Sequence, residues 1–227
     1  MSADRPAPSP GPILVVNPNS SQSVTDGLSR ALERFRVPGG PAIECLTIAE
    51  GPPGIITQRH VEEAGLRLAD LAERRPDASA FVIACYSDPG IDLVRSVTAA
   101  PVYGIQEAGV LSALARADRI GVIAVAATSI PRHLRYLRRM GVESRLAGEL
   151  ALDGLSVAES GHGEAAFAQL ADRGERLKAL GAGAVVLGCA GMAAQRARLE
   201  KRLGLPVVDP TQAAVAMALG GILAAAA

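Results

Sequence analysis

The sequence predicts an α/β protein made of two pseudo-symmetric, doubly wound parallel-sheet halves, with the site in the cleft between them. Short apolar runs alternate with longer segments of helical periodicity, which is typical of a parallel sheet covered by helices on both faces. The alternation occurs twice within 227 residues, a length that can support a large core. Aromatic residues make up only 3% of the chain, so we expect an aliphatic core.

The elements of the first half follow from apolar runs bounded by turn residues. We expect strands at 13–17, 43–47, 81–85 and 101–104, and helices at 21–36, 57–75, 88–98 and 106–116. The first helix follows "NPNSSQS", whose Asn and Ser side chains can cap free backbone N–H groups.

The second half repeats this pattern. We expect strands at 120–125, 144–148, 184–188 and 206–208, of which 144–148 has the weakest pattern, and helices at 130–140, 163–180, 192–203 and 211–225. The segment "GHGEAAF" (161–167) is rich in glycine, but it has neither a Walker nor a dinucleotide-binding pattern. We interpret it as a loop that enters a helix, and no cofactor is expected.

An internal repeat relates the two halves. Ile13 and Ile120 are 107 positions apart, Cys85 and Cys189 are 104 apart, and the segments that begin at Pro101 and Pro206 are 105 apart. Similar offsets at three places indicate duplicated βα units. We therefore divide the chain into a disordered leader (1–11), a first half (12–116) closed by the C-terminal helix, and a second half (117–227).

Composition limits the partners and the compartment. Lys plus Arg and Asp plus Glu both number 23, which argues against nucleic acid or an anionic membrane as the main partner. No apolar run reaches the roughly 18 residues of a membrane span, and the N-terminus lacks the features of a secretory signal. Three cysteines without tight spacing fit a reducing compartment, so we expect a cytoplasmic protein. The densest basic stretch, 132–145, is interpreted as a solvated helix face.

Two cysteines occupy matching positions in the halves. Cys85 follows the apolar run of "FVIACYSDPG" (81–90), and Cys189 follows that of "VVLGCAGM" (185–192). Because ligands bind at the carboxyl ends of parallel strands, we expect both thiols at one cleft, with pKa values lowered toward neutrality by backbone N–H groups. Opposed thiols can remove a proton from one face of a carbon and deliver one to the other, as racemisation requires.

The other candidate sites are weaker. Cys45 lies within a strand pattern and is expected to be an inert, buried thiol. His60, His133 and His162 are scattered, and no CxxC or HxxxH spacing occurs, so no metal site is predicted.

The motifs resemble the aspartate/glutamate racemase superfamily, and more closely its hydantoin and allantoin racemase branch. The resemblance covers roughly residues 12 to 215 and is carried by "VVNPNSS" (15–21), "CYSDPG" (85–90), "PVYGIQEA" (101–108) and "LGCAGM" (187–192). It implies cofactor-independent inversion by two cysteines, here Cys85 and Cys189. It also implies a small-molecule substrate between the halves and a homo-oligomer.

The resemblance also implies residues that contact the substrate. They are Asn17 after the first strand, Tyr86, Ser87, Gly188 and Ala190 beside the cysteines, and Thr128 and Ser129 on a further wall. A helix cap remains an alternative role for Thr128 and Ser129.

Two departures from the branch concern the substrate. Tyr86 and Ser87 stand where the branch usually has Phe-Gly, and "GPPGIIT" (51–57) replaces a segment that usually contains a serine and an acid. Both segments are expected to line the site. The resemblance to the hydantoin and allantoin branch implies a 5-substituted hydantoin or allantoin as the substrate, and the two departures leave a different ring or an open-chain acid as alternatives.

Other activities remain open at this stage. An aspartate- or glutamate-type racemase, a decarboxylase and a cis-trans isomerase all belong to the same superfamily. A non-catalytic small-molecule binding protein on the same scaffold would have ordinary, unreactive thiols.

Overall fold

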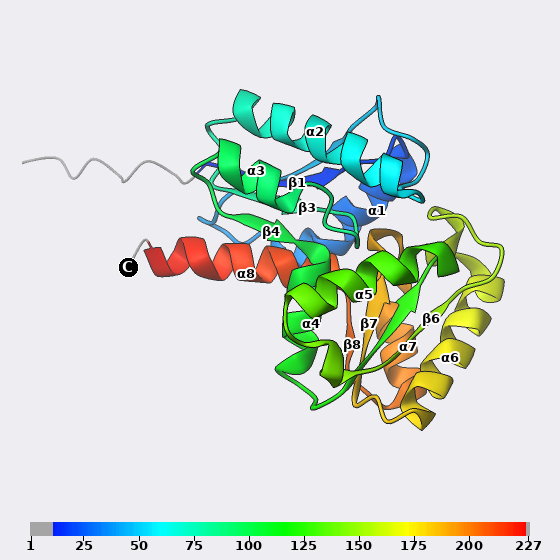
Figure 1. The fold of residues 1–227 in the computed structure, drawn as a ribbon. Helices are drawn as coiled ribbons and strands as arrows, with labels where there is room; N and C mark the ends of the chain where they lie inside the picture. Colours follow the sequence, from blue (N-terminus) through cyan, green and yellow to red (C-terminus); the bar gives the residue numbers. More distant parts are fainter. Residues whose placement is uncertain (1–10, 226–227) are drawn as a thin grey trace, which may run out of the picture.

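The fold contains two four-stranded parallel sheets, each flanked by helices (Figure 1). A computed structural model describes residues 11–225. The predicted leader thus lies outside the described residues, except for Gly11. The duplicated α/β architecture expected from the sequence is confirmed.

Both sheets have the same strand order, which is β2-β1-β3-β4 in the first and β6-β5-β7-β8 in the second. The first comprises β1 (Ile13–Asn17), β2 (Ile43–Thr47), β3 (Ala80–Ile83) and β4 (Val102–Gly104). The second comprises β5 (Ile120–Ala124), β6 (Leu146–Ala151), β7 (Ala184–Gly188) and β8 (Val207–Val208). Ile13 pairs with Ala80 as Ile120 pairs with Ala184, so the central strands of the two sheets share a register.

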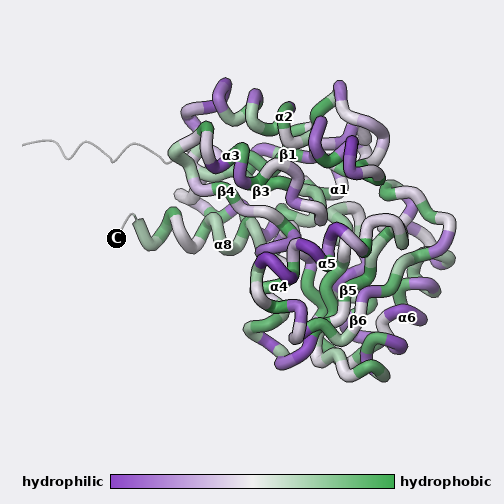
Figure 2. The backbone as a smooth tube through the Cα atoms, viewed as in Figure 1, coloured by the Kyte–Doolittle hydropathy of each residue, from purple (hydrophilic) through white to green (hydrophobic). Residues whose placement is uncertain are grey.

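Helices cover the sheets and expose their polar faces. They are α1 (Gln22–Ala31), α2 (Gln58–Arg74), α3 (Ile91–Val97), α4 (Ile105–Leu114), α5 (Ile130–Arg139), α6 (Gly163–Ala179), α7 (Arg196–Leu203) and α8 (Pro210–Ala225). Figure 2 shows hydrophilic residues along the outer turns of α2 and α6. The central strands β1, β3, β5 and β7 are buried throughout, because helices cover both faces. None of the helices within 11–225 is both long and apolar enough to cross a membrane.

Several predicted boundaries differ from the structure. The predicted helix 21–36 is α1, which ends at Ala31 and is followed by the 3-10 helix Glu33–Phe35. The predicted strand 144–148 is β6 at Leu146–Ala151, since a 3-10 helix takes up residues Glu143–Arg145. The predicted helix 192–203 begins as the 3-10 helix Ala190–Gln195 before α7. The predicted strand 81–85 is β3, which ends at Ile83, so that Cys85 lies in the following turn.

The C-terminal helix α8 crosses to the first sheet. In Figure 1 it runs beside β4, and it packs against α4. Its residues Val215 and Ala218 are buried in the same core cluster as Val82 and Ile105 of the first half. The core of the first half is therefore completed by residues that follow β8.

Candidate active site

One cavity collects residues from both sheets. Its volume is about 50 Å³, and both Cys85 and Cys189 lie in its wall. The lining residues are Asn19, Val24, Ile55, Ala84, Cys85, Tyr86, Ser87, Val125, Ser129, His133, Val157, Gly188, Cys189 and Ala190. The carboxyl ends of β3 and β7 thus bring the two thiols to a shared space, as ligand sites of such sheets require.

The two thiols have matching backbone environments. Gly191 donates its backbone N–H to Cys189 Sγ at 3.4 Å, and the backbone N–H of Ser87 donates to the Cys85 thiol. In each half the donor is therefore the second residue after the cysteine. This local repeat matches the sequence offset between the halves and gives each sulfur one stabilising hydrogen bond from the backbone.

The expected lowering of the thiol pKa values is wrong, because both pKa values are raised. Burial raises the pKa of Cys85 to about 12 against the opposing effect of the Ser87 N–H. Burial likewise raises the pKa of Cys189 to about 11, although the Gly191 N–H and Ser160 lower it. Removing a thiolate from water costs more than one or two hydrogen bonds recover, so desolvation decides the sign.

The two sulfurs also interact electrostatically. After burial and the Ser87 N–H, the next contribution to the Cys85 pKa is a rise caused by charge on Cys189. Ionising both sulfurs together is therefore disfavoured. One thiolate facing one thiol is the charge state that a two-base exchange of protons needs.

Most of the predicted contact residues lie at this cavity. Tyr86, Ser87, Ser129, Gly188 and Ala190 line it together with the two cysteines. The predicted lining segment 51–57 contributes Ile55. Cys45 lies on β2 and does not line the cavity, and burial raises the pKa of its thiol.

Asn17 and Thr128 do not line this cavity. Asn17 is fully buried, and its Nδ2 donates to Asn19 Oδ1 at 3.0 Å and to Thr25 Oγ1 at 3.1 Å. Asn19, two residues later, lies in the cavity wall instead. Thr128 faces a separate surface pocket with Pro131. Asn17 therefore orders the loop that carries Asn19.

A buried polar chain behind Ser87 was missed by sequence reasoning. His133 Nε2 lies 3.3 Å from Ser87 Oγ, and His133 Nδ1 lies 2.6 Å from Glu149 Oε1. The side chains of His133 and Glu149 are 3% and 1% exposed. The Tyr86 ring packs edge-on against the His133 ring at 5.1 Å. No local sequence pattern marks this chain, because His133 on α5 and Glu149 on β6 meet only in the folded protein.

Arg132 corrects the interpretation of 132–145 as a solvated face. Its Nε donates to Ser87 Oγ at 2.9 Å, and its Nη2 donates to Ser129 Oγ at 2.8 Å. Its Nη1 donates to the backbone oxygen of Ile56 at 3.0 Å. The guanidinium thus fastens the 51–57 loop to the cavity wall, while Arg138 of the same helix is mostly exposed.

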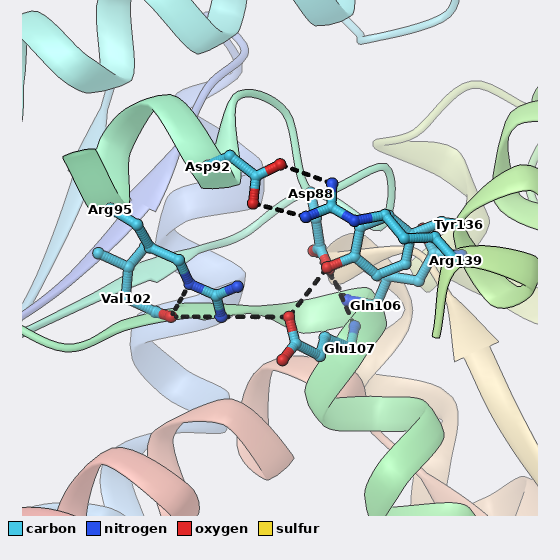
Figure 3. Close-up of polar contacts among 8 residues, drawn as sticks. All are labelled: Asp88, Asp92, Arg95, Val102, Gln106, Glu107, Tyr136 and Arg139. Carbon is cyan, nitrogen blue, oxygen red and sulfur yellow. Dashed lines mark hydrogen bonds and ion pairs between the residues drawn. The ribbon is translucent and has the colours of Figure 1, made fainter. Parts of the chain in front are cut away.

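Each half also holds a buried carboxylate at a helix N-terminus. Asp88 accepts the backbone N–H groups of Gln106 and Glu107, both at 2.9 Å, at the start of α4 (Figure 3). Asp209 accepts the N–H of Gln212 at 2.7 Å at the start of α8. Burial raises the pKa of Asp88 to about 7 and that of Asp209 to about 6, against these hydrogen bonds. Charge on each carboxylate raises the pKa of the cysteine in the same half.

The network around Asp88 also joins the halves. Tyr136 of α5 donates its hydroxyl hydrogen to Glu107 Oε2 at 2.9 Å, and Arg139 pairs with Asp92 of α3 at 2.6 Å (Figure 3). Among residues 11–225, no cluster of three or more His, Cys, Asp or Glu side chains is arranged to hold a metal ion.

Two sheets of identical strand order, with a cysteine from each at one cavity, have the Asp/Glu racemase fold. A family model described as Asp/Glu/Hydantoin racemase matches residues 13–218, and the chain belongs to this family.

Individual relatives agree with this assignment. A hydantoin racemase of Paenarthrobacter aurescens is 33% identical over 217 residues, covering 91% of this chain and 89% of the relative. The solved allantoin racemase from Klebsiella pneumoniae superposes with a TM-score of 0.88 at 30% identity, covering 95% of this chain and 89% of that one. The allantoin racemase from Pseudomonas fluorescens gives a TM-score of 0.85 at 27% identity, covering 94% and 91%.

Proposed function

We propose that the protein is a cofactor-independent racemase of 5-substituted hydantoins or of allantoin, with Cys85 and Cys189 as its two bases. The relatives named hydantoin racemase and allantoin racemase support the substrate class. The observation that carries the mechanism is the meeting of two matched cysteines, one from each half, in the wall of one cavity.

The proposed reaction exchanges one proton on each face of the substrate. The thiolate of one cysteine takes the hydrogen from the ring carbon next to the carbonyl, and the electron pair of that C–H bond moves onto the carbonyl oxygen. The electron pair then returns from the oxygen to the carbon and takes the proton of the other cysteine's thiol on the opposite face, which leaves that sulfur as a thiolate. The two cysteines have exchanged protonation states, and the product is the other enantiomer.

The raised thiol pKa values fit this chemistry in one respect. A sulfur whose pKa is about 11 or 12 is rarely ionised at neutral pH. Once ionised, it is a stronger base than an ordinary thiolate and better able to remove a hydrogen from carbon. Arg132, whose charge lowers the Cys85 pKa after larger effects, is placed to support that ionised form.

We propose that the substrate contacts Tyr86, Ser87, Ser129, Gly188 and Ala190, with Asn19 in the contact role first expected for Asn17. All six line the cavity. Gly188 supports close packing there, since a Cβ on it would lie 2.6 Å from the Ile123 oxygen. A side chain at position 188 would therefore push the β7 end and its cysteine out of place.

The balance of charges and the exposed apolar side chains of α8 bear on the assembly and location of the protein. We propose a cytoplasmic homo-oligomer that acts on a small molecule and binds neither nucleic acid nor membranes. Equal numbers of acidic and basic residues and an apolar α8, with Leu223 54% exposed, support this proposal. We also propose that 12–116 and 117–227 are the two structural units, with α8 shared between them.

The direct test is racemisation in D₂O. Single enantiomers of 5-benzylhydantoin and of allantoin are incubated with the wild-type protein and with the Cys85→Ser and Cys189→Ser variants. Wild type is expected to lose optical rotation and to place deuterium at the stereocentre. Each variant is expected to racemise at least about 100-fold more slowly, because one base is missing.

A matched control is Cys45→Ser, which changes a thiol outside the cavity and is expected to keep wild-type activity. If either cavity variant racemises at the wild-type rate, the two-thiol mechanism is wrong.

A further inference from the structure

A groove much larger than the cysteine cavity lies beside it, between the two halves. It forms where α1 of the first half packs against the 3-10 helix Ala190–Gln195 of the second, and its volume is about 630 Å³. Small-molecule sites typically have volumes of roughly 300 to 1,000 Å³. We call this space the α1 groove. The racemase mechanism proposed above does not use it.

The charged side chains of the α1 groove are mostly cationic. Arg30, Arg34 and Arg196 line it together with one acid, Glu33. Glu33 pairs with Arg36, which lies outside the groove, at 3.3 Å. Arg196 pairs at 3.2 Å with a glutamate one turn along its own helix, whereas no carboxylate within residues 11–225 pairs with Arg30 or Arg34. Two guanidinium groups are therefore available to a ligand, although the chain as a whole has equal numbers of acidic and basic residues.

The remaining lining of the α1 groove consists mainly of small side chains. Half of its sixteen residues are glycine or alanine, and Gln212 and His162 add polar groups. Small side chains let the body of a ligand lie close to the backbone. A guanidinium group binds a carboxylate or a phosphate through two parallel hydrogen bonds. The groove therefore suits an organic molecule that carries several negative charges.

The α1 groove shares a wall with the cysteine cavity. Val24 and Ala190 line both spaces. Gly191 lines the groove, and its backbone N–H donates to Cys189 Sγ at 3.4 Å. A Cβ on Gly191 would lie 3.7 Å from this sulfur, so a single residue connects the groove with the thiol. A ligand in the groove would therefore touch the turn that holds Cys189.

We propose that the α1 groove binds an organic anion with two or three negative charges, held by Arg30, Arg34 and Arg196, and that this anion inhibits the protein through Cys189. The negative charge of the ligand disfavours a thiolate on the other side of Gly191. The ligand also packs against the turn that an attacking sulfur would have to adjust. The inhibition of racemisation rests on the proposed function, whereas the binding of the anion and its effect on the thiol do not.

The first test measures binding of two probes, citrate and metal-free ADP, by isothermal titration calorimetry in a buffer of low ionic strength. At least one probe is expected to bind saturably, one molecule per chain, with a Kd below about 1 mM. Citrate offers only carboxylates, whereas ADP offers phosphates on a planar base, so the comparison shows which chemistry the groove accepts. If neither probe binds saturably, the proposal is wrong.

The second test uses the arginines of the groove. Arg30→Gln and Arg34→Gln are each expected to weaken binding about tenfold, because each removes a charged partner of the anion. Without the anion both variants should racemise at the wild-type rate, since neither residue lines the cysteine cavity. Arg59→Gln is the matched control, because it removes the same charge from an exposed position on α2. Unchanged binding in an Arg30→Gln, Arg34→Gln double variant, or an equal loss in Arg59→Gln, overturns the site.

A third measurement separates this proposal from the proposed function. Iodoacetamide labelling at pH 9 is followed with and without the tighter-binding probe, at an ionic strength matched with NaCl. The bound anion is expected to slow alkylation of Cys189 at least about threefold and to affect Cys85 less, because only Cys189 adjoins the groove. The double variant should lose this effect. Unchanged alkylation of Cys189, or equal slowing at both cysteines, overturns the inhibitory role. The expected pattern supports it even if no substrate is racemised.

Discussion

Each thiol of the cavity accepts one backbone N–H and has a buried carboxylate in the same half of the protein. The N–H groups of Ser87 and Gly191 favour the thiolates, whereas burial and the charges of Asp88 and Asp209 oppose them. Together these effects raise both pKa values, so the neutral thiol is favoured in both halves. Both sulfurs therefore carry their protons at neutral pH.

This balance predicts slow alkylation of both cysteines. Iodoacetamide is expected to react with Cys85 and Cys189 at pH 7.5 at least about 100-fold more slowly than with a free thiol, because only thiolates react. The rates should rise about tenfold per pH unit up to pH 10, since the pKa values are about 12 and about 11. Mass spectrometry of the labelled peptides measures each site separately.

A rate that levels off below pH 9 at either cysteine would contradict the raised pKa values. Slow alkylation at neutral pH would not favour a binding protein over a racemase, because the raised pKa values predict it for both. Racemisation by the wild-type protein, and its loss in the Cys85 and Cys189 variants, distinguishes these functions.

Single residues also mark the limit of prediction from sequence. Cys85 and Cys189 could be identified because each follows an apolar run at a repeated offset. His133 could not, since its meeting with Glu149 depends on α5 packing over β6. Arg132 could not be distinguished from the exposed arginines of the same helix. A sequence gives the spacing of charges along a helix, but it does not show which loop covers a given side chain.

At the scale of elements, the two helices that follow β4 and β8 receive a carboxylate by different routes. Asp209 comes directly before α8, whereas Asp88 reaches α4 from the loop after β3. Gly104 lies at the position before α4 and makes room for this carboxylate. A Cβ there would lie 2.3 Å from the Asp88 carboxyl group.

We expect Gly104→Ala to destabilise the protein by at least about 2 kcal/mol, because the buried Asp88 carboxyl cannot move away without losing its two N–H donors. Gly220→Ala is the matched control. It lies on an exposed turn of α8 with nothing within 4 Å of a new Cβ, so it should gain about 0.5–1 kcal/mol of helix propensity. Urea unfolding of both variants measures the two changes.

Equal effects of the two substitutions would show that Asp88 does not fill the space above Gly104. The eight strands and eight α-helices found within residues 11–225 were all expected from sequence patterns near their observed positions. The deviations lie at element ends, for example where 3-10 helices at 33–35, 143–145 and 190–195 replace regular structure. Such ends depend on hydrogen bonds to distant loops, and local patterns carry no signal for them.

At the scale of the whole molecule, α8 makes the halves depend on each other. Val215 is fully buried in the core of the first half, although it follows the last strand of the second. The offset of the repeat predicted two similar halves, and the first half was expected from the sequence to be closed by the C-terminal helix. The contacts of Tyr136 with Glu107 add a second link.

We expect Val215→Ala to lower the free energy of unfolding by about 2 kcal/mol, because it removes buried methyl groups and leaves a cavity. Hydrogen exchange followed by mass spectrometry should show an equal loss of protection for peptides of β1 and β3 and for those of β5 and β7. Loss confined to the first sheet would instead indicate halves that unfold independently, with α8 belonging to the first.

The two sulfurs lie on walls of unequal chemistry, with Tyr86 and Ser87 after one and Ala190 and Gly191 after the other. Mirror-image molecules have the same free energy in water, so a racemase at equilibrium must process both with the same kcat/KM. An asymmetric pocket cannot alter that equality. It can only give the two enantiomers different values of kcat and of KM. The enantiomer with the smaller KM must then also have the smaller kcat.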